Sequence, residues 1–276
     1  MKCKRLLSVP VLSVLFLVGF IYYTTVFVFI EDWLGLKSPV GILNALIFSS
    51  LAFMWLVSFA ACVLIDPGHV PPTFVPDVED GEASDQALKK NGVRSRYCDK
   101  CCIYKPPRAH HCRVCRSCIL KMDHHCLWVN NCVGYSNYKA FVNLVIYAAM
   151  GCIYSMVIIL NAALKKDWKY GESFPLKIFY ITCGCIIVTL SLVLGTLLGW
   201  HIYLLSNNMT TIEYHEGIRA IWLARKSGQS YHHPYNFGLY RNINLILGPK
   251  MLKWFCPMEI SHLKDGISFR TVRDNL

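Results

Sequence analysis

Long apolar runs alternate with polar segments along this chain of 276 residues. Four of the runs, residues 9–30, 38–65, 140–164 and 178–209, hold no Asp, Glu, Lys or Arg. Each is long enough for a helix that crosses the hydrocarbon core of a bilayer, which takes about 20 residues. The composition, with 54% hydrophobic and 16% charged residues, agrees with a lipid environment. The pattern predicts an all-α integral membrane protein with four transmembrane helices.

The first apolar run has an alternative interpretation as a cleaved signal peptide, because Lys2, Lys4 and Arg5 precede it. A signal peptide has a shorter apolar stretch, followed by small residues at the cleavage site. Here the stretch is longer and ends at Glu31 and Asp32 without such a site. We therefore favour a membrane helix.

Basic residues are distributed unevenly among the polar segments. Residues 1–8, 66–139 and 210–276 hold 23 of the 28 Lys and Arg residues, and the loops 31–37 and 165–177 hold the other 5. Because basic residues are retained on the cytosolic side of a membrane, both termini and the segment between the second and third spans are predicted to be cytosolic. The bilayer also accounts for the net charge of +11, since a basic residue near an anionic leaflet gains about 1 kcal/mol. No soluble stretch combines a basic stripe with stacking aromatic residues, so nucleic acid is excluded as a partner.

The polar segments divide into four parts. Residues 1–8 form a short N-terminus. Residues 66–96 begin with an Asp-Pro-Gly triplet that ends the second span and continue as a linker, at first rich in proline and then acidic. Residues 97–139 form a cysteine-rich domain that leads directly into the third span, and residues 210–276 form a tail that is partly ordered at best. No repeat and no lipidation signal at either end is evident.

Eight cysteines and four histidines are concentrated in the 35 residues of the cysteine-rich domain from 98 to 132. Two Cys-x2-Cys pairs have the spacing that lets one turn present two thiolates to a tetrahedral ion. With two more cysteines and two histidines they make two sets of three cysteines and one histidine, drawn from Cys98, Cys101, His111, Cys112, Cys115, Cys118, His125 and Cys132. That composition is typical of structural zinc, and a reducing cytosol keeps the cysteines available to metal. Two zinc ions are therefore predicted, although spacing alone does not decide how the ligands pair.

The residues left over include His124, which follows Asp123 directly, and Cys126, two residues after His124. A thiol near a histidine whose ring is oriented by a carboxylate is the arrangement of a nucleophile, base and orienting group. The alternative is a membrane-tethered zinc scaffold that recruits partners without chemistry, and ligand counts alone favour it. In either case so short a polar segment needs metal to fold.

The spacing of these residues resembles one protein family closely. The DHHC-type protein S-acyltransferases, or palmitoyltransferases, share the pattern C-x2-C-x9-H-C-x2-C-x2-C-x4-D-H-H-C-x5-C-x4-N-x3-F, and residues 98–141 match every position of it. Shorter motifs of that family also match: Asp66-Pro67-Gly68, Thr210-Thr211-Ile212-Glu213 and the aromatic and asparagine residues between 235 and 242. The stretch at residues 76–80 is most similar to plant members.

The resemblance implies roles for individual residues. Cys126 would take the acyl group from acyl-coenzyme A, with His124 as the base and Asp123 orienting it. One structural zinc ion would be held by Cys98, Cys101, His111 and Cys118, and the other by Cys112, Cys115, His125 and Cys132. Trp128 would lie beside the reacting thioester. Residues that brace the active site would be Asp66, Thr210, Thr211, Glu213 and Asn242.

The same resemblance implies a two-step reaction, in which palmitoyl-coenzyme A acylates Cys126 and the acyl group then passes to a cysteine of a membrane-associated protein. Candidates for binding the coenzyme phosphates are Lys105, Arg108, Arg113 and Lys121, for which a solvated face is an equal interpretation. The Golgi is the membrane expected from the family, with the plasma membrane and endoplasmic reticulum as alternatives. A metal transporter that uses His201 is a further alternative, but no second polar group is evident at depth in a neighbouring span.

The predicted orientation can be tested at Asn208, which with Met209 and Thr210 forms a glycosylation acceptor triplet. A cytosolic end of the fourth span never meets the glycosylation machinery, so we expect no mass shift when the membrane-expressed protein is treated with glycosidase. A shift that disappears in the Asn208→Gln variant would overturn the orientation.

Overall fold

The computed structural model describes residues 5–76, 96–166 and 174–275. Within these residues, four helices are long and apolar enough to cross a membrane: Val9–Leu34, Pro39–Leu64, Tyr138–Lys165 and Phe174–Ser206. This confirms the four-helix prediction. Most of the linker before residue 96 lies outside the described residues. The chain divides into two compact units, described separately below.

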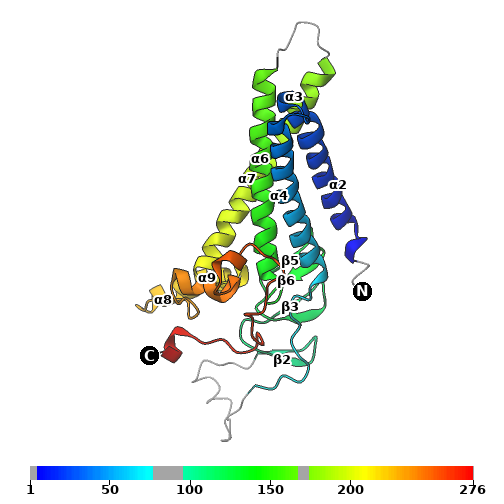
Figure 1. The fold of residues 1–276 in the computed structure, drawn as a ribbon. Coiled ribbons are helices and arrows are strands. Elements are labelled where there is room, and N and C mark those ends of the chain that lie inside the picture. The colour runs from blue at the N-terminus through cyan, green and yellow to red at the C-terminus, as the bar shows by residue number, and fades with distance from the viewer. Residues whose placement is uncertain (1–4, 77–95, 167–173, 276) are drawn as a thin grey trace, which may run out of the picture. The chain divides into compact units, whose positions relative to one another are not determined.

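The first unit is the bundle of membrane helices, formed by residues 1–63, 140–202 and 256–258. Its first helix runs through α2 (Val9–Tyr23), the π-helical η1 (Thr24–Ile30) and α3 (Glu31–Leu34). The others are α4 (Pro39–Leu64), α6 (Tyr138–Lys165) and α7 (Phe174–Ser206), and they lie beside it in Figure 1. Phe29 and Ile30 pack with Ile158, Tyr180 and Ile187 in an apolar core.

Polar side chains cross-link the helices inside this bundle. The hydroxyl groups of Thr25 and Ser155 lie 2.6 Å apart in a buried pair. At the start of the loop that follows α6, Lys166 donates to Asp32 over 2.6 Å, and the hydroxyl of Tyr180 donates to the same carboxylate. Because apolar burial does not distinguish protein from lipid, such hydrogen bonds help to specify how the helices pack.

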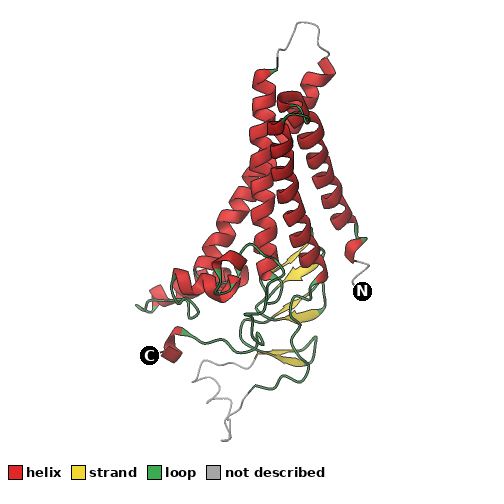
Figure 2. Ribbon diagram, in the orientation of Figure 1, coloured by secondary structure: helices red, strands yellow, loops and turns green. Residues whose placement is uncertain are grey.

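The second unit contains the cysteine-rich domain, which folds as three short antiparallel hairpins (Figure 2). The strands are β1 (Arg96–Cys98), β2 (Ile103–Lys105), β3 (His110–Cys112), β4 (Ser117–Ile119), β5 (His124–Cys126) and β6 (Asn131–Val133). Strands of three residues are too short to show an alternating pattern, so the sequence pattern predicts none of them. The fold is mostly helical, with this small β component between the second and third spans.

The three hairpins form an internal repeat of 14 residues. Their first strands begin at residues 96, 110 and 124, and their second strands at 103, 117 and 131. Cys102, Arg116 and Asn130 occupy the same place in the three turns, and each has a left-handed backbone, with φ of 53°, 53° and 47°. The repeat is therefore conformational as well as positional. No repeat is evident on first inspection of the sequence, because only the metal-ligand positions keep their chemistry from one copy to the next.

The Asp-Pro-Gly triplet joins the end of α4 to the edge of the second hairpin. Asp66 Oδ1 accepts hydrogen bonds from the backbone N–H of Gly68 at 2.8 Å and from that of His69 at 3.2 Å. Gly68, with φ of 97°, accepts the backbone N–H of Leu120 at 2.8 Å. The turn thus places the chain against β4, where His69 forms a bridge to Ile119.

The tail after α7 is better ordered than its composition predicts. It contains α8 (Thr211–Lys226), α9 (Leu239–Leu247) and the short 3₁₀ turns η2 (Met251–Lys253) and η3 (Val272–Asn275). Between the two turns, Lys264 donates its backbone N–H to the Tyr135 hydroxyl at 2.9 Å, and the rings of Phe269 and Tyr135 meet edge to face. Gly266 (φ 71°) lies so close that an added Cβ would be 2.5 Å from the Tyr135 ring. The end of the tail therefore packs on the cysteine-rich domain.

A buried ion pair anchors α8 to the cysteine-rich domain. The Arg108 side chain donates to both carboxylate oxygens of Glu213, at 2.6 and 2.7 Å, and these residues are only 4% and 7% exposed. The guanidinium also stacks over the ring of Tyr235, 4.2 Å from its centroid. Burial alone would raise the pKa of Glu213, but the charge and hydrogen bonds of Arg108 lower it to about 2.

This ion pair corrects one prediction from the sequence. Arg108, suggested as a ligand of coenzyme phosphates, is committed inside the protein to Glu213. Lys121, suggested for the same role, donates through Nζ to Asn208 Oδ1 at 3.0 Å. A basic residue in sequence does not reveal whether its charge faces solvent or an internal carboxylate.

Replacing Glu213 by Gln leaves the buried Arg108 charge without its counter-charge. Breaking one partner of a buried pair costs about 3–5 kcal/mol, so we expect a clearly lower melting temperature for the purified protein in detergent. Glu216, exposed on the same helix, provides the matched control: Glu216→Gln should melt like the wild type. Equal melting temperatures for the two variants would contradict the anchoring role of the pair.

Candidate functional site

The first three-cysteine, one-histidine cluster joins the first two hairpins. Cys98 ends β1 and Cys101 lies in the turn that follows, and His111 and Cys118 face each other across β3 and β4. His111 Nδ1 lies 3.6, 3.2 and 3.8 Å from the sulfur atoms of Cys98, Cys101 and Cys118. Tetrahedral zinc with bonds of about 2.0–2.3 Å places its ligands about 3.5–3.8 Å apart. These four side chains can therefore hold one zinc ion.

The second cluster repeats this arrangement one hairpin later. Cys112 ends β3 and Cys115 lies in the turn that follows, and His125 and Cys132 face each other across β5 and β6. His125 Nδ1 lies 3.7, 3.4 and 3.6 Å from the three sulfur atoms. The four positions are those of the first cluster shifted by 14 residues, and they coincide with the pairing implied by the family resemblance. The middle hairpin supplies ligands to both clusters.

The candidate catalytic residues lie on the third hairpin. His124 Nδ1 is 2.6 Å from Asp123 Oδ2, and the side chain of His124 is also hydrogen-bonded to Cys126. Asp123 is almost completely buried, whereas about a third of the His124 side chain is exposed. His124 and Cys126 are two residues apart on β5, so their side chains project to the same face of the strand. The Asp-His-Cys sequence is therefore brought together as a connected chain of hydrogen bonds.

The electrostatic balance of this group favours charge separation. Burial would lower the pKa of His124, but its hydrogen bonds to Asp123 and Cys126 raise it to about 9. Burial would raise the pKa of Cys126, but the hydrogen bond and charge of His124, with backbone N–H groups of Val129 and Trp128, lower it. Both directions favour a thiolate beside an imidazolium, which is the reactive form of a cysteine nucleophile.

The start of α8 binds the carboxylate of Asp123. Thr211 donates its backbone N–H to Asp123 Oδ1 at 2.9 Å and its hydroxyl to Oδ2 at 3.1 Å. Thr210 is the N-cap, and it exchanges reciprocal hydrogen bonds with Glu213 in a capping box. The helix therefore presents its N-terminal N–H groups to a buried negative charge. Within the motif at 210–213, Thr210 and Glu213 bond to each other and Thr211 binds Asp123.

The other predicted residues lie in different surroundings. Asn242 is fully buried, accepts the backbone N–H of Phe237, and donates to the carbonyl of Ser206 at 2.7 Å, which ties α9 to the end of α7. Asp66 forms the turn described above. The indole of Trp128 is 59% exposed, and its backbone N–H contributes to the environment of Cys126. The sequence pattern alone does not reveal the Arg108 anchor, because Arg108 has no partner nearby in sequence.

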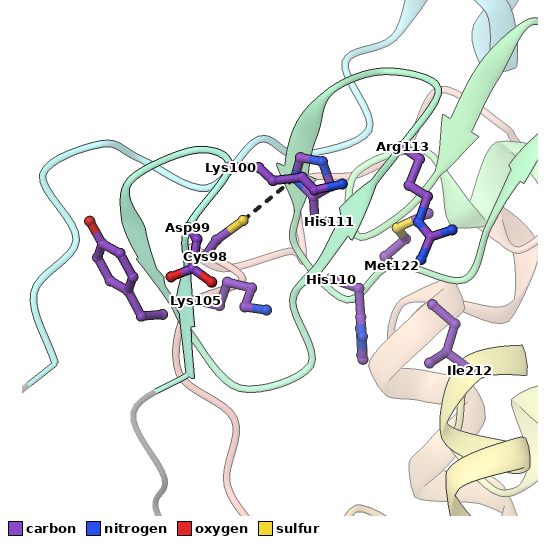
Figure 3. Close-up of a pocket in the computed structure, with 10 residues that line it drawn as sticks. Cys98, Asp99, Lys100, Lys105, His110, His111, Arg113, Met122 and Ile212 are labelled. Atoms are coloured by element: carbon purple, nitrogen blue, oxygen red, sulfur yellow. Dashed lines mark hydrogen bonds between the residues drawn. The ribbon is translucent and has the colours of Figure 1, made fainter.

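A basic pocket of about 500 Å³ opens on the first two hairpins (Figure 3). Its lining residues are Tyr97, Cys98, Asp99, Lys100, Lys105, His110, His111, Arg113, Met122 and Ile212. Lys105 and Arg113, two of the predicted phosphate ligands, both line it. With Lys100 they give the pocket three basic side chains against one carboxylate, that of Asp99, so the pocket could bind an anionic ligand.

The clusters make a direct prediction about metal content. Cys115→Ala removes a ligand from the second cluster only, so we expect zinc to fall from about two ions per chain to about one, with a lower melting temperature, because structural zinc contributes on the order of 10 kcal/mol to folding. Cys102, exposed and outside both clusters, is the control. Two ions in Cys115→Ala, or a loss of metal in Cys102→Ala, would contradict the ligand assignment.

Comparison with known proteins agrees with this site. A family model described as DHHC palmitoyltransferase matches residues 92–218. Probable protein S-acyltransferase 15 of Arabidopsis thaliana is 56% identical over 257 residues, which cover 93% of this chain and 100% of that protein. Probable protein S-acyltransferase 16 from the same plant is 48% identical over 98% of the chain and 94% of that protein, and number 13 is 35% identical over 92% and 86%. The chain therefore belongs to the DHHC palmitoyltransferase family of acyltransferases and is similar to plant members over almost its whole length.

Proposed function

We propose that the chain transfers a long-chain acyl group from acyl-coenzyme A to cysteine thiols of membrane-associated proteins, through an S-acyl intermediate on Cys126. The observation that carries this proposal is the hydrogen-bonded sequence from Asp123 through His124 to Cys126 within one hairpin. A buried carboxylate, a partly exposed imidazole and a thiol in that order form the arrangement required for nucleophilic acyl transfer.

In the first step the Cys126 sulfur attacks the carbonyl carbon of the thioester. The bond from that carbon to the coenzyme A sulfur breaks, and His124 supplies a proton to the departing thiolate. Asp123 holds the imidazole by its Nδ1 side and stabilises its charged form, so the other ring nitrogen is available for proton transfer. Thr211 in turn fixes the Asp123 carboxylate.

In the second step the thiol of a protein substrate loses its proton to His124 and attacks the same carbonyl carbon. The bond to Cys126 breaks, and the acyl group leaves on the new sulfur. One thioester replaces another in each step, so the exchange needs no nucleotide energy source. The proton taken up in this step restores His124 to its starting form.

We assign the polar part of acyl-coenzyme A to the basic pocket on the first two hairpins. Lys105 and Arg113 supply positive charge there, and Lys100 lines the same pocket. Phosphate groups bind favourably to Lys and Arg side chains through charge-assisted hydrogen bonds. Because Arg108 and Lys121 are engaged inside the protein, we leave them out of this assignment.

We assign two zinc ions a structural role at the clusters. Three cysteines and one histidine complete a tetrahedral ion and leave no open position for a substrate. The ions would hold the third hairpin in place, so Asp123, His124 and Cys126 act on a rigid support.

We further propose that both termini and the cysteine-rich domain face the cytosol of an endomembrane, which the resemblance to the family indicates to be the Golgi. The excess of Lys and Arg in the corresponding segments supports the orientation. Protein substrates would therefore present their cysteines at the cytosolic face.

The proposal predicts that purified protein in detergent becomes labelled by radioactive palmitoyl-coenzyme A, in a form that hydroxylamine removes. Cys126→Ser should abolish the label, because a serine hydroxyl is a far weaker nucleophile than a thiolate, while zinc stays at about two ions per chain. Cys102→Ser, which changes an exposed thiol of the same domain, should retain the label. A fully metallated wild type that takes up no label would instead support a zinc scaffold.

A further inference from the structure

Cys126 occupies a metal-ligand position of the 14-residue repeat. It is the last residue of β5, as Cys112 is of β3 and Cys98 is of β1. The strand pairings are equivalent as well, since Cys98, Cys112 and Cys126 pair with Ile103, Ser117 and Asn131. The nucleophile is thus the third copy of the first cysteine in each Cys-x2-Cys turn.

The third copy lacks the other ligands of a metal site. The second cysteine of the turn, Cys101 or Cys115 in the first two hairpins, is replaced by Val129, which is 1% exposed. Each existing cluster takes its histidine from the next hairpin, but the third hairpin is followed by α6. The residue at the histidine position there is Lys139, whose Nζ donates to the carbonyl of Glu259 at 2.8 Å. A third cluster therefore cannot be completed.

The series of metal-binding hairpins also stops at the first hairpin, which lacks the cross-strand His–Cys pair of ligands. The positions of the cross-strand His–Cys pair are taken in the first hairpin by Tyr97 and Tyr104, which face each other in register. Their rings pack edge to face, with centroids 5.1 Å apart. The hairpins therefore form a series in which tyrosines close one end and the unmetallated Cys126 stands at the other.

The turn of the third hairpin keeps the backbone positions of a metal-binding turn. In the second hairpin, the backbone N–H of Cys115 donates to the Cys112 sulfur at 3.3 Å. In the third, Val129 takes the place of Cys115 and Cys126 that of Cys112, in hairpins with the same strand register and the same left-handed residue in the turn. The repeat therefore places the Val129 N–H at the Cys126 sulfur. In metal-binding turns, such donors stabilise a thiolate bound to the ion.

The three equivalent cysteines differ in the positive charge that balances the negative charge on the sulfur. In the first two hairpins the clusters can supply a metal ion. In the third, the imidazole of His124 does so, held by the Asp123 carboxylate. The residues equivalent to this pair in the second hairpin are Ala109 and His110, and alanine cannot orient the ring.

We propose that the third hairpin is a zinc-binding turn that lacks the second ligand, and that the backbone N–H group of Val129 stabilises negative charge on the Cys126 sulfur during acyl transfer. This inference rests on the proposed function of Cys126. The charge is present when the sulfur attacks the thioester, and it returns when the bond from the acyl carbon to Cys126 breaks in the second step. Val129 is a positioning residue: its N–H group faces the Cys126 sulfur, and its apolar side chain cannot bind a metal ion there.

A single substitution tests the geometry without relying on activity. Val129→Cys restores the second thiol of the turn, so we expect the purified protein in excess Cd²⁺, after desalting, to hold about three metal ions (zinc plus cadmium) instead of about two. The matched control is Asn130→Cys, because Cys102 already occupies the equivalent place in the first hairpin without joining a cluster. Wild type and Asn130→Cys should stay at about two. Two ions in Val129→Cys, equal to the control, would overturn the inference.

The same samples separate the inference from the proposed function. Labelling of Val129→Cys by palmitoyl-coenzyme A should be blocked by Cd²⁺ and restored by a chelator, whereas Asn130→Cys should be labelled under both conditions. If the wild type takes up no label while Val129→Cys still gains a third ion, the proposed function fails and the turn geometry stands.

The hydrogen bonds are tested by replacing Val129 with its α-hydroxy analogue, which exchanges the N–H for an ester oxygen and keeps the side chain. A hydrogen bond to a charged group is worth enough to lower the rate of self-acylation about tenfold. The apparent KM for palmitoyl-coenzyme A and the two zinc ions should be unchanged. The same exchange at Leu127 should leave the rate near that of the wild type. An unchanged rate in the Val129 ester would overturn the role of this N–H.

Discussion

The cysteine-rich domain depends on two clusters of three cysteines and one histidine, each able to hold a tetrahedral ion. A two-stranded hairpin is marginally stable at best in water, and strands of three residues are shorter than most. The apolar material that buries them is modest, as in the cluster around Val70, Ala109 and Leu120. Cross-links from one hairpin to the next replace the core that so short a segment cannot build. The position of Cys126 is then set by the same cross-links that hold the domain together.

Buried charges supply the second level of organisation. The Asp123 carboxylate is satisfied by His124 on one side and by the start of α8 on the other, and Glu213 of the same helix is satisfied by Arg108. One helical turn thus serves both an orienting carboxylate and a structural ion pair. The motif at 210–213 therefore acts through two partners distant in sequence: Asp123, 88 residues before Thr211, and Arg108, 105 residues before Glu213.

Much of the architecture follows from the sequence. Four uncharged runs predict four membrane helices, because each is longer than the about 20 apolar residues that a helix needs to cross the bilayer. Cys-x2-Cys spacing predicts metal ligands, and Asp123, His124 and Cys126 are adjacent enough to suggest their roles. The three-residue strands were not predictable, since they are shorter than the period that would identify them. The destination of Arg108 was not predictable either, because a charge in sequence carries no information about a partner 105 residues later.

The order of the elements along the chain also bears on biosynthesis. All eight cluster residues lie after the second membrane helix and before the third, and Cys132 precedes the start of α6 by only six residues. During translation, the last ligand therefore leaves the ribosome just ahead of the helix that follows it into the membrane. Metal capture and insertion of the third span thus involve adjacent stretches of the chain at nearly the same time. A cell poor in available zinc would accumulate molecules with their membrane helices in place and their cysteines exposed, a form suited to recognition by quality-control proteases.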